Sequence, residues 1–235
     1  AGLARVLAFD EAQQLQRGVL LLDDAVADVG PVEAADELAR LFELQVLHDW
    51  IRGAASADGR SDIFFTSGQS LEISSVGAFD QGYTAPKYRN VTSAGVRGSD
   101  GQFADTDFPM FRLADAYLMY AEAVLRGGGG SQATALGYVN QIRRRAYGGA
   151  SGDITAGELT LDFILDERAR ELFWEAHRRS DLVRYGRFTG GTYLWAFKGS
   201  RQAPGGMASA GHLNLYPIPA SDLAVNPNLT QNPGY

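Results

Sequence analysis

The sequence predicts a mainly α-helical protein in which helical hairpins carry long loops and short β-hairpin pieces. Apolar residues recur every three or four positions in several stretches, as they do on the buried face of a helix. Glycine is abundant, at 28 of 235 residues, and many glycines lie beside aromatic residues between those stretches. Such shaped loops on a helical frame are typical of binding proteins.

The composition excludes several classes of function. A net charge of −7 argues against nucleic acid as the main partner, because phosphate binding requires a basic face. The longest apolar runs fall far short of the roughly 20 residues that span a bilayer. The absence of cysteine excludes disulfides, thiolate metal sites and cysteine nucleophiles. Because the chain also lacks a signal pattern, we expect any targeting segment to lie outside it.

Two helices are predicted at the start of the chain. Leucine, alanine and valine recur at helical spacing over residues 1–29, and a second amphipathic stretch runs from 31 to about 51, with Trp50 on its apolar face. We set residues 1–57 apart as N-terminal helices without an assigned family and treat 58–235 as one domain. Residues 53–107 are rich in small, polar and aromatic types, so we expect short hairpin pieces there.

A helical hairpin is predicted next. Apolar residues from Met110 to Leu125 mark one buried face, which predicts a helix that starts near Phe108. Gly127-Gly-Gly-Gly130 ends this helix, and Ser131 is suited to cap the next, which carries arginines towards its C-terminus. Two helices joined by so short a loop form the unit from which tetratricopeptide-like stacks are built.

A further single helix is predicted over residues 160–185. Thr160 is suited to be its N-cap, and Gly186 is suited to end it. Trp174 lies among charged neighbours in this stretch, and we expect it to be a core residue. The polar tail that follows ends on Tyr235, which we expect to pack back on the frame as a latch.

Several ordered blocks of this sequence resemble the C-terminal half of the SusD/RagB family, the surface glycan-binding lipoproteins of Bacteroidota. The blocks are Pro86-Lys-Tyr-Arg-Asn90 and residues 107–123, 139–146, 166–186, 195–199, 215–219 and 226–235. The segment 193–199 is most similar to the starch-utilisation branch.

The resemblance implies a non-enzymatic, tetratricopeptide-like protein on the cell-surface face of the outer membrane. Such a protein caps a SusC-type TonB-dependent transporter and hands it oligosaccharides for nutrient import, without a cofactor. Family members are about twice as long and carry a lipid anchor near the N-terminus. We therefore expect this chain to be a fragment or a short variant whose anchor lies outside it.

Loop aromatics are the candidates for sugar contact. Tyr and Trp offer a flat apolar face to a pyranose ring and a polar tip to its hydroxyls. The candidate ligand-binding residues are Tyr83, Tyr88, Asn90, Tyr193, Trp195, Phe197 and Lys198, with Trp195 first. The alternative interpretation is that these aromatics pin the loops to the helical frame.

The charged series at 167–184 raises the question of an enzyme. A glycosidase needs two carboxylates that face each other across a cleft, roughly 5 to 10 Å apart. Glu167, Glu171 and Glu175 are instead spaced four apart, with arginines between them. We interpret the series as an internal ion-pair network, with Arg168, Glu171, Arg178 and Asp181 as its leading members.

The sequence predicts no metal site and no cofactor. The three histidines lack ligand spacing, so no zinc site is predicted. Calcium could be held by Asp100, Asp105 and Asp107, although their spacing matches no known calcium loop.

Two other functions stay open: a helical scaffold that binds peptide or protein and no sugar, and a glycoside hydrolase, which the carboxylate spacing disfavours.

Overall fold

The computed structural model describes residues 57–75, 77–85 and 87–235. The helices predicted before residue 52, including Trp50, lie outside the described residues. The predicted domain boundary at residue 57 therefore stays a prediction. The chain divides into two compact units. Among the described residues, one unit comprises 57–69 and 83–177, and the other comprises 70–82 and 178–235.

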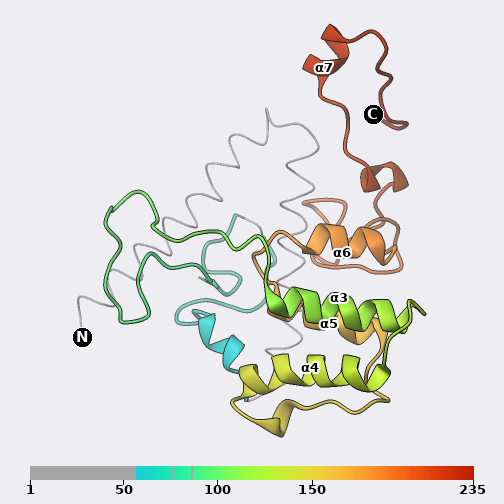
Figure 1. The fold of residues 1–235 in the computed structure, drawn as a ribbon. Helices are drawn as coiled ribbons and strands as arrows, with labels where there is room; N and C mark the ends of the chain where they lie inside the picture. The colour runs from blue at the N-terminus through green and yellow to red at the C-terminus, as the bar shows by residue number, and fades with distance from the viewer. Residues whose placement is uncertain (1–56, 76, 86) are drawn as a thin grey trace. The chain divides into compact units, whose positions relative to one another are not determined.

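The helical hairpin is confirmed in the first of these units. Helices α3 (Leu113–Leu125) and α4 (Gln132–Tyr147) are joined by the glycine-rich loop and pack side by side (Figure 1). The Ser131 hydroxyl accepts a hydrogen bond from the Thr134 amide at 3.3 Å, as the sequence predicts for an N-cap. The rings of Tyr117 and Tyr138 stack across the two helices, with their centroids 4.2 Å apart.

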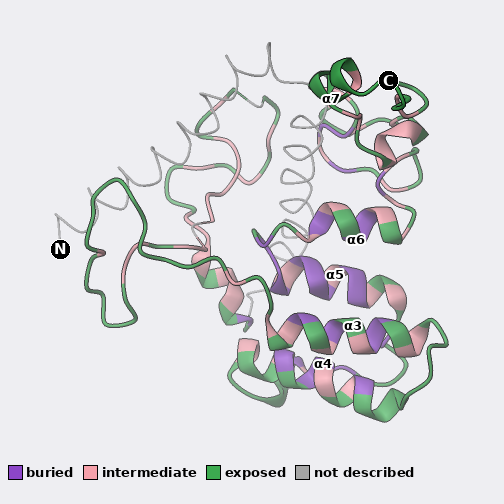
Figure 2. Cartoon of the chain, turned by 45° about the horizontal axis from the view of Figure 1, so that its top comes forward, coloured by how far each residue is buried: buried purple, intermediate pink, exposed green. Residues whose placement is uncertain are grey.

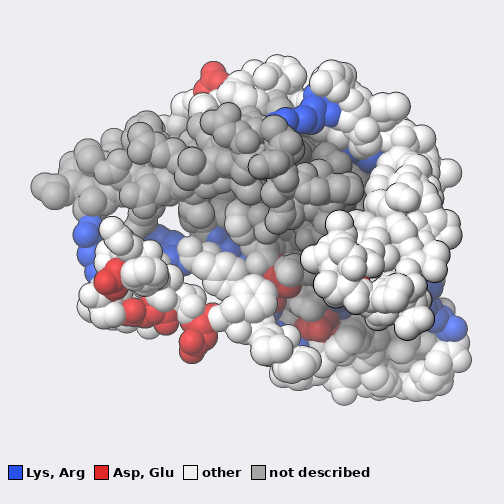
Figure 3. Space-filling model, turned by 90° about the horizontal axis from the view of Figure 1, so that it is seen from above, with Lys and Arg blue, Asp and Glu red and all other residues white. Residues whose placement is uncertain are grey.

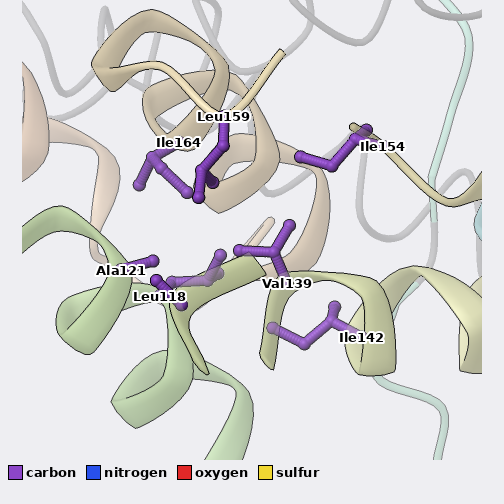
Figure 4. Close-up of a cluster of buried hydrophobic side chains, with 8 residues drawn as sticks. Leu118, Ala121, Val139, Ile142, Ile154, Leu159 and Ile164 are labelled. Carbon is purple, nitrogen blue, oxygen red and sulfur yellow. The ribbon is translucent and has the colours of Figure 1, made fainter. Parts of the chain in front are cut away.

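Helix α5 (Leu161–Glu171) packs against α3 and completes the frame of this unit. Thr160 caps it, accepting from the Phe163 amide at 3.1 Å. Buried side chains from the three helices and the α4–α5 connection form one apolar core, drawn in Figure 4 and visible as the buried stripes of Figure 2. The core residues are Leu118, Ala121, Ala135, Val139, Ile142, Ile154, Leu159 and Ile164.

Helix α3 begins five residues later than predicted. Residues 104–109 have no regular secondary structure, Met110 lies in a bend, and Arg112 is the N-cap residue in an extended conformation, with φ −129°. The Arg112 guanidinium reaches the carboxylates of Glu171 and Glu175 instead of continuing a helix. Met110, predicted on the buried face, is therefore exposed.

The prediction of a single helix over residues 160–185 is wrong. Helix α5 ends at Glu171, and a second short helix, α6 (Arg178–Arg184), follows in the other unit. In the intervening turn, Trp174 and Ala176 both have φ 60°, a left-handed conformation that stops a helix. The expectation that Trp174 is a core residue is also wrong, because 42% of it is exposed.

The other unit contains α6, the 3-10 helix η3 (Gly211–Asn214) and α7 (Ala220–Val225). Its C-terminal residues fold back on the segment around η3, which belongs to the tail itself, whereas the latch interpretation places Tyr235 on the helical frame. The Tyr235 hydroxyl donates to the Leu215 carbonyl at 2.7 Å, and its ring meets the His212 ring edge-on. Gln231 exchanges two hydrogen bonds with the backbone of Ile218.

The short β-hairpin pieces are reduced to isolated bridges. Within the described ranges these join Phe65 to Thr84, Ser70 to Gln81, Val91 to Arg97 and Gly190 to Ser209. Two 3-10 helices, η1 (Gly59–Ile63) and η2 (Ala150–Gly152), complete the unit of α3 to α5. None of the helices in the described part of the chain has the length and apolarity needed to cross a membrane.

Candidate functional site

A buried charge cluster lies on α5 and the turn after it. Its carboxylates come from Glu167, Glu171 and Glu175, which are at most 4% exposed, and from Asp58 at the start of η1. Cations from four other segments and from α5 itself surround them. The members of the charge cluster are Asp58, Arg60, Lys87, Arg112, Arg143, Arg145, Glu167, Arg170, Glu171 and Glu175.

Glu167 shows why these carboxylates stay ionised. Its oxygens accept from Arg60, Arg143 and Arg170, each at 2.9 Å. Burial of the Glu167 carboxylate raises its pKa, but the three guanidinium groups together outweigh burial and lower the pKa to about 2. A general acid for glycoside hydrolysis needs a raised pKa, so Glu167 is unsuited to that role.

Glu171 and Glu175 bind basic side chains of the segments that precede α3. Arg112 donates to Glu171 Oε1 at 3.0 Å, to the Glu171 carbonyl at 2.9 Å and to Glu175 Oε2 at 2.7 Å. Lys87 pairs with Glu175 and donates to the Glu171 carbonyl at 3.1 Å. Burial lowers the pKa of Lys87 although Glu175 opposes the shift. Segment 83–90, which carries three candidate ligand residues, is therefore anchored directly to the end of α5.

The four residues predicted to lead an ion-pair network fall in both units. Glu171 lies in the charge cluster, and Arg168 donates to Asp115 of α3 at 2.7 Å. In the other unit, Arg178 donates to the Tyr193 hydroxyl at 3.2 Å and Asp181 accepts from Arg184 at 2.7 Å. All four are buried.

The candidate ligand residues of segment 83–90 occupy three different settings. Tyr83 is half-buried. Tyr88 is half-buried as well, with its ring against Phe108, and burial of its hydroxyl raises the pKa. Asn90 holds the loop 98–106, because its amide bonds Asp100 and Phe103 carbonyls and the Asp105 amide. Among these three residues, Tyr83 is therefore the preferred candidate for ligand contact.

The candidates at 193–198 are mostly interior residues. Trp195 is 3% exposed, and Phe197 and Lys198 are each 1% exposed. The Lys198 ammonium lies 4.4 Å from the Trp195 ring centroid and donates to the Tyr193 carbonyl at 2.7 Å. A buried ring cannot offer its face to a sugar, so burial favours the packing interpretation for these three. Tyr193 is half-buried and keeps partial access to solvent.

The aspartates considered for calcium are used within their own loop. Asp100 accepts from the amides of Gln102 and Phe103, and Asp105 accepts from the amide and hydroxyl of Ser99. These hydrogen bonds lower the pKa of both carboxyls. Across the described residues, no group of three or more His, Asp or Glu side chains is arranged to hold a metal ion. The expectation of no metal cofactor, with calcium left open, stays a prediction.

Sequence reasoning missed most of the basic partners in the charge cluster. Arg60, Lys87, Arg112 and Arg143 come from segments up to 111 residues away in sequence from the glutamates that they bind. Lys87, Arg112 and Arg143 lie inside the blocks 86–90, 107–123 and 139–146, which carry the family resemblance. Their place in those blocks was the signal that could have identified them.

Helices α3, α4 and α5 thus form a packed frame, and the buried charge cluster lies on α5 and the turn after it. Residues 64–235 match the sequence profile of the SusD family, and the chain belongs to that family.

Two curated relatives make the comparison specific. The chain is 39% identical over 184 residues to the starch-binding protein SusD of Bacteroides thetaiotaomicron, which covers 77% of this chain and 32% of that protein. It is 31% identical over 208 residues to SusD-like protein P2 of Formosa agariphila, covering 82% of this chain and 39% of that one. The chain therefore spans only a third to two fifths of the length of these relatives.

Solved structures agree on the tetratricopeptide-like helical fold. A SusD superfamily protein from Parabacteroides distasonis superposes with a TM-score of 0.55 at 28% identity, over 82% of this chain and 41% of that one. A second one, from Bacteroides vulgatus, gives a TM-score of 0.54 at 26% identity, over 80% of this chain and 38% of that one.

Proposed function

We propose that this chain is part of a non-enzymatic surface protein that captures an oligosaccharide or polysaccharide, with a starch-like glucan as the first candidate. The observation that carries this proposal is the 39% identity, over 77% of the chain, to a protein named for starch binding.

The charge cluster supports a binding role without catalysis. Each of its α5 carboxylates is buried and bonded to several cations, so none is available as an acid, a base or a nucleophile. The cluster instead fixes segment 83–90 and the N-cap of α3 on the helical frame. A binding protein needs such pre-organised loops, because ordering them on binding would cost affinity.

The charge pattern is consistent with a neutral ligand. On the face shown in Figure 3, the described surface carries small separate groups of basic and acidic atoms and no continuous basic area. A neutral sugar needs apolar faces and hydrogen-bonding groups rather than a strong field.

The proposed partner is a SusC-type TonB-dependent transporter in the outer membrane, and the proposed location is the cell-surface face of that membrane. A lipid anchor would attach the protein there. The test is co-purification of the tagged protein with TonB-dependent transporters from detergent extracts of its source cells, and absence of any such complex contradicts this part of the proposal.

Affinity electrophoresis tests the binding function. The chain is run through native gels that contain starch, other α- and β-glucans, fructan or pectin. We expect retardation by an α-glucan and weaker retardation of Tyr83→Ala and Tyr193→Ala. Phe111→Ala is the matched control, because Phe111 is an exposed aromatic that is not among the candidates for sugar contact. Equal mobility of the wild type in every gel contradicts the proposal.

A second candidate function rests on one exposed segment. Phe103, Phe108, Met110 and Phe111 are each more than half exposed, and Phe111 is 88% exposed. Exposed apolar side chains of this size are typical of surfaces that bind peptide or protein. If the chain binds no polysaccharide and Phe111→Ala abolishes capture of a hydrophobic peptide library, the peptide-binding scaffold is the better assignment.

A further inference from the structure

The turn 172–177 holds two non-glycine residues in a backbone conformation that glycine usually adopts. Trp174 and Ala176 both have φ 60°. In this conformation Cβ crowds the following carbonyl oxygen, so a non-glycine residue is uncommon there and a bulky one is an outlier. Conformations of this kind persist only where the surroundings over-determine them, and they gather at binding and catalytic sites.

The side chains of Glu175 and Phe173, which lie between and beside these two residues, hold the turn in this conformation. Glu175 is 4% exposed, and its carboxylate is bound by Arg112 at 2.7 Å and by Lys87. Phe173 is buried against Phe64, with ring centroids 6.3 Å apart. The Glu175 amide also donates to the Leu172 carbonyl at 3.1 Å, which closes the turn.

The turn therefore alternates between interior and surface. Phe173 and Glu175 are buried, whereas Trp174 and Ala176 are exposed. This alternation places the largest apolar side chain in the turn at the surface, with 42% of it exposed. The Trp174 ring meets the Phe173 ring edge-on, with centroids 6.1 Å apart, so part of the indole is packed while 42% of the residue stays exposed.

We propose that Trp174 is a sugar-contact residue, whose indole face stacks on the apolar C–H face of a pyranose ring. An indole is a rigid flat platform with a polar N–H at its edge, and a backbone held on both sides keeps that platform pre-oriented. The left-handed turn displays the ring, and Glu175 ties the same turn to Lys87 and hence to segment 83–90. This assignment rests on the proposed sugar-binding function and names a residue of that site.

Binding measurements on three variants test the assignment. Trp174→Ala removes the platform, Trp174→Phe keeps a smaller aromatic ring, and Phe111→Ala removes an exposed aromatic outside the turn. Dissociation constants for soluble starch come from mobility in gels of graded starch content, and circular dichroism melts report folding. We expect Trp174→Ala to bind at least about tenfold more weakly, Trp174→Phe to lie between it and the wild type, and Phe111→Ala to match the wild type.

Fluorescence gives a readout that a purely structural role would not move. Iodide quenches exposed indoles, and Trp195 is buried, so the difference between wild type and Trp174→Phe isolates the signal of Trp174. Maltoheptaose should reduce that difference as it binds.

The outcomes separate this assignment from the proposed function. Starch binding by wild type and Trp174→Ala with equal constants, or iodide quenching of Trp174 that maltoheptaose leaves unchanged, overturns the assignment and leaves the proposed function standing. A wild type that binds no polysaccharide overturns both. A Trp174→Phe variant that melts like the wild type but binds like Trp174→Ala still supports the assignment, because the indole itself is then required.

Discussion

The two faces of α5 are equally buried, but apolar packing stabilises one face and ion pairs stabilise the other. On one face, Leu165 and Ala169 are apolar and buried, and the adjacent Ile164 joins the core of α3 and α4. On the other face, Glu167 and Glu171 are just as inaccessible and are bonded to arginines from η1, α4 and the segment before α3. Burial alone therefore does not indicate whether a helix face packs against apolar side chains or against groups of opposite charge.

The difference lies in how specific each face must be. Apolar burial is non-directional and scales with area, so any well-shaped apolar neighbour satisfies it. A buried carboxylate is stable only if cations and donors replace the water that it lost. The apolar face can therefore tolerate repacking, whereas the charged face should fail when one partner is removed.

Loss of one cluster carboxylate should have the largest effect. Glu171→Gln leaves Arg60, Arg112 and Arg145 facing a neutral amide in a buried setting. Breaking such a group by removing one partner costs about 3–5 kcal/mol of unfolding free energy. Urea denaturation followed by circular dichroism measures the change.

Leu118→Ala on the apolar side is the matched comparison. Leu118 is fully buried in the core, and such a deletion costs about 2–5 kcal/mol. Leu118→Met, which conserves volume, should cost less than about 1.5 kcal/mol. If Glu171→Gln is as mild as Leu118→Met, the claim that the charged face is the less tolerant one is wrong.

Acid should weaken the charged face and leave the apolar face unchanged. The pKa of Glu167 falls from 4.5 to about 2 on folding, so the folded state favours its ionised form. The resulting stabilisation is complete above pH 4.5 and is lost as the pH falls through 2. The shift corresponds to roughly 3 kcal/mol, measurable as the loss of unfolding free energy between pH 5 and pH 2.

Other carboxylates titrate in the same range, so a control is needed. Asp100, Asp105 and Glu158 have lowered pKa values as well, through hydrogen bonds at the surface. Glu167→Gln removes only the contribution of Glu167. A variant whose stability falls with acid as steeply as that of the wild type would show that Glu167 does not carry the effect.

The apolar half of this comparison could be predicted from the sequence. Periodic apolar residues located the α3–α4 hairpin, and Ser131 and Thr160 cap helices where short polar side chains before an apolar run indicate a start. These signals are local, since each depends on residues within a turn or two. The start of α3 and the break after α5 depend on distant partners, Glu171 with Arg112 and Glu175 with Lys87, which no local pattern contains.

The site shows the same limit. Residue type correctly indicated that aromatics line the loops, but it could not distinguish a buried ring from an exposed one. Trp195, ranked first for ligand contact, is interior, and Trp174, expected in the core, is at the surface. The reason is the left-handed turn at 174–176, which reverses the side that a helical periodicity assigns.

Two neighbouring arginines of α4 give the smallest and most direct test of the comparison. Arg143 is 12% exposed as a side chain and pairs with buried Glu167, whereas Arg144 is 56% exposed and pairs with Asp153. Both lie near the end of the same helix, so changing either to alanine alters helix propensity equally. Arg143→Ala should cost about 2 kcal/mol, less than a fully broken pair costs, because Arg60 and Arg170 still bind Glu167.

Arg144→Ala should leave the urea midpoint unchanged, because solvent and salt already screen an exposed pair. Salt extends the same contrast: 1 M NaCl should leave the difference between the two variants largely intact, since buried pairs are screened much less. Equal midpoints for the two variants would mean that distance between charges, and not burial, sets the weight of an ion pair on this frame.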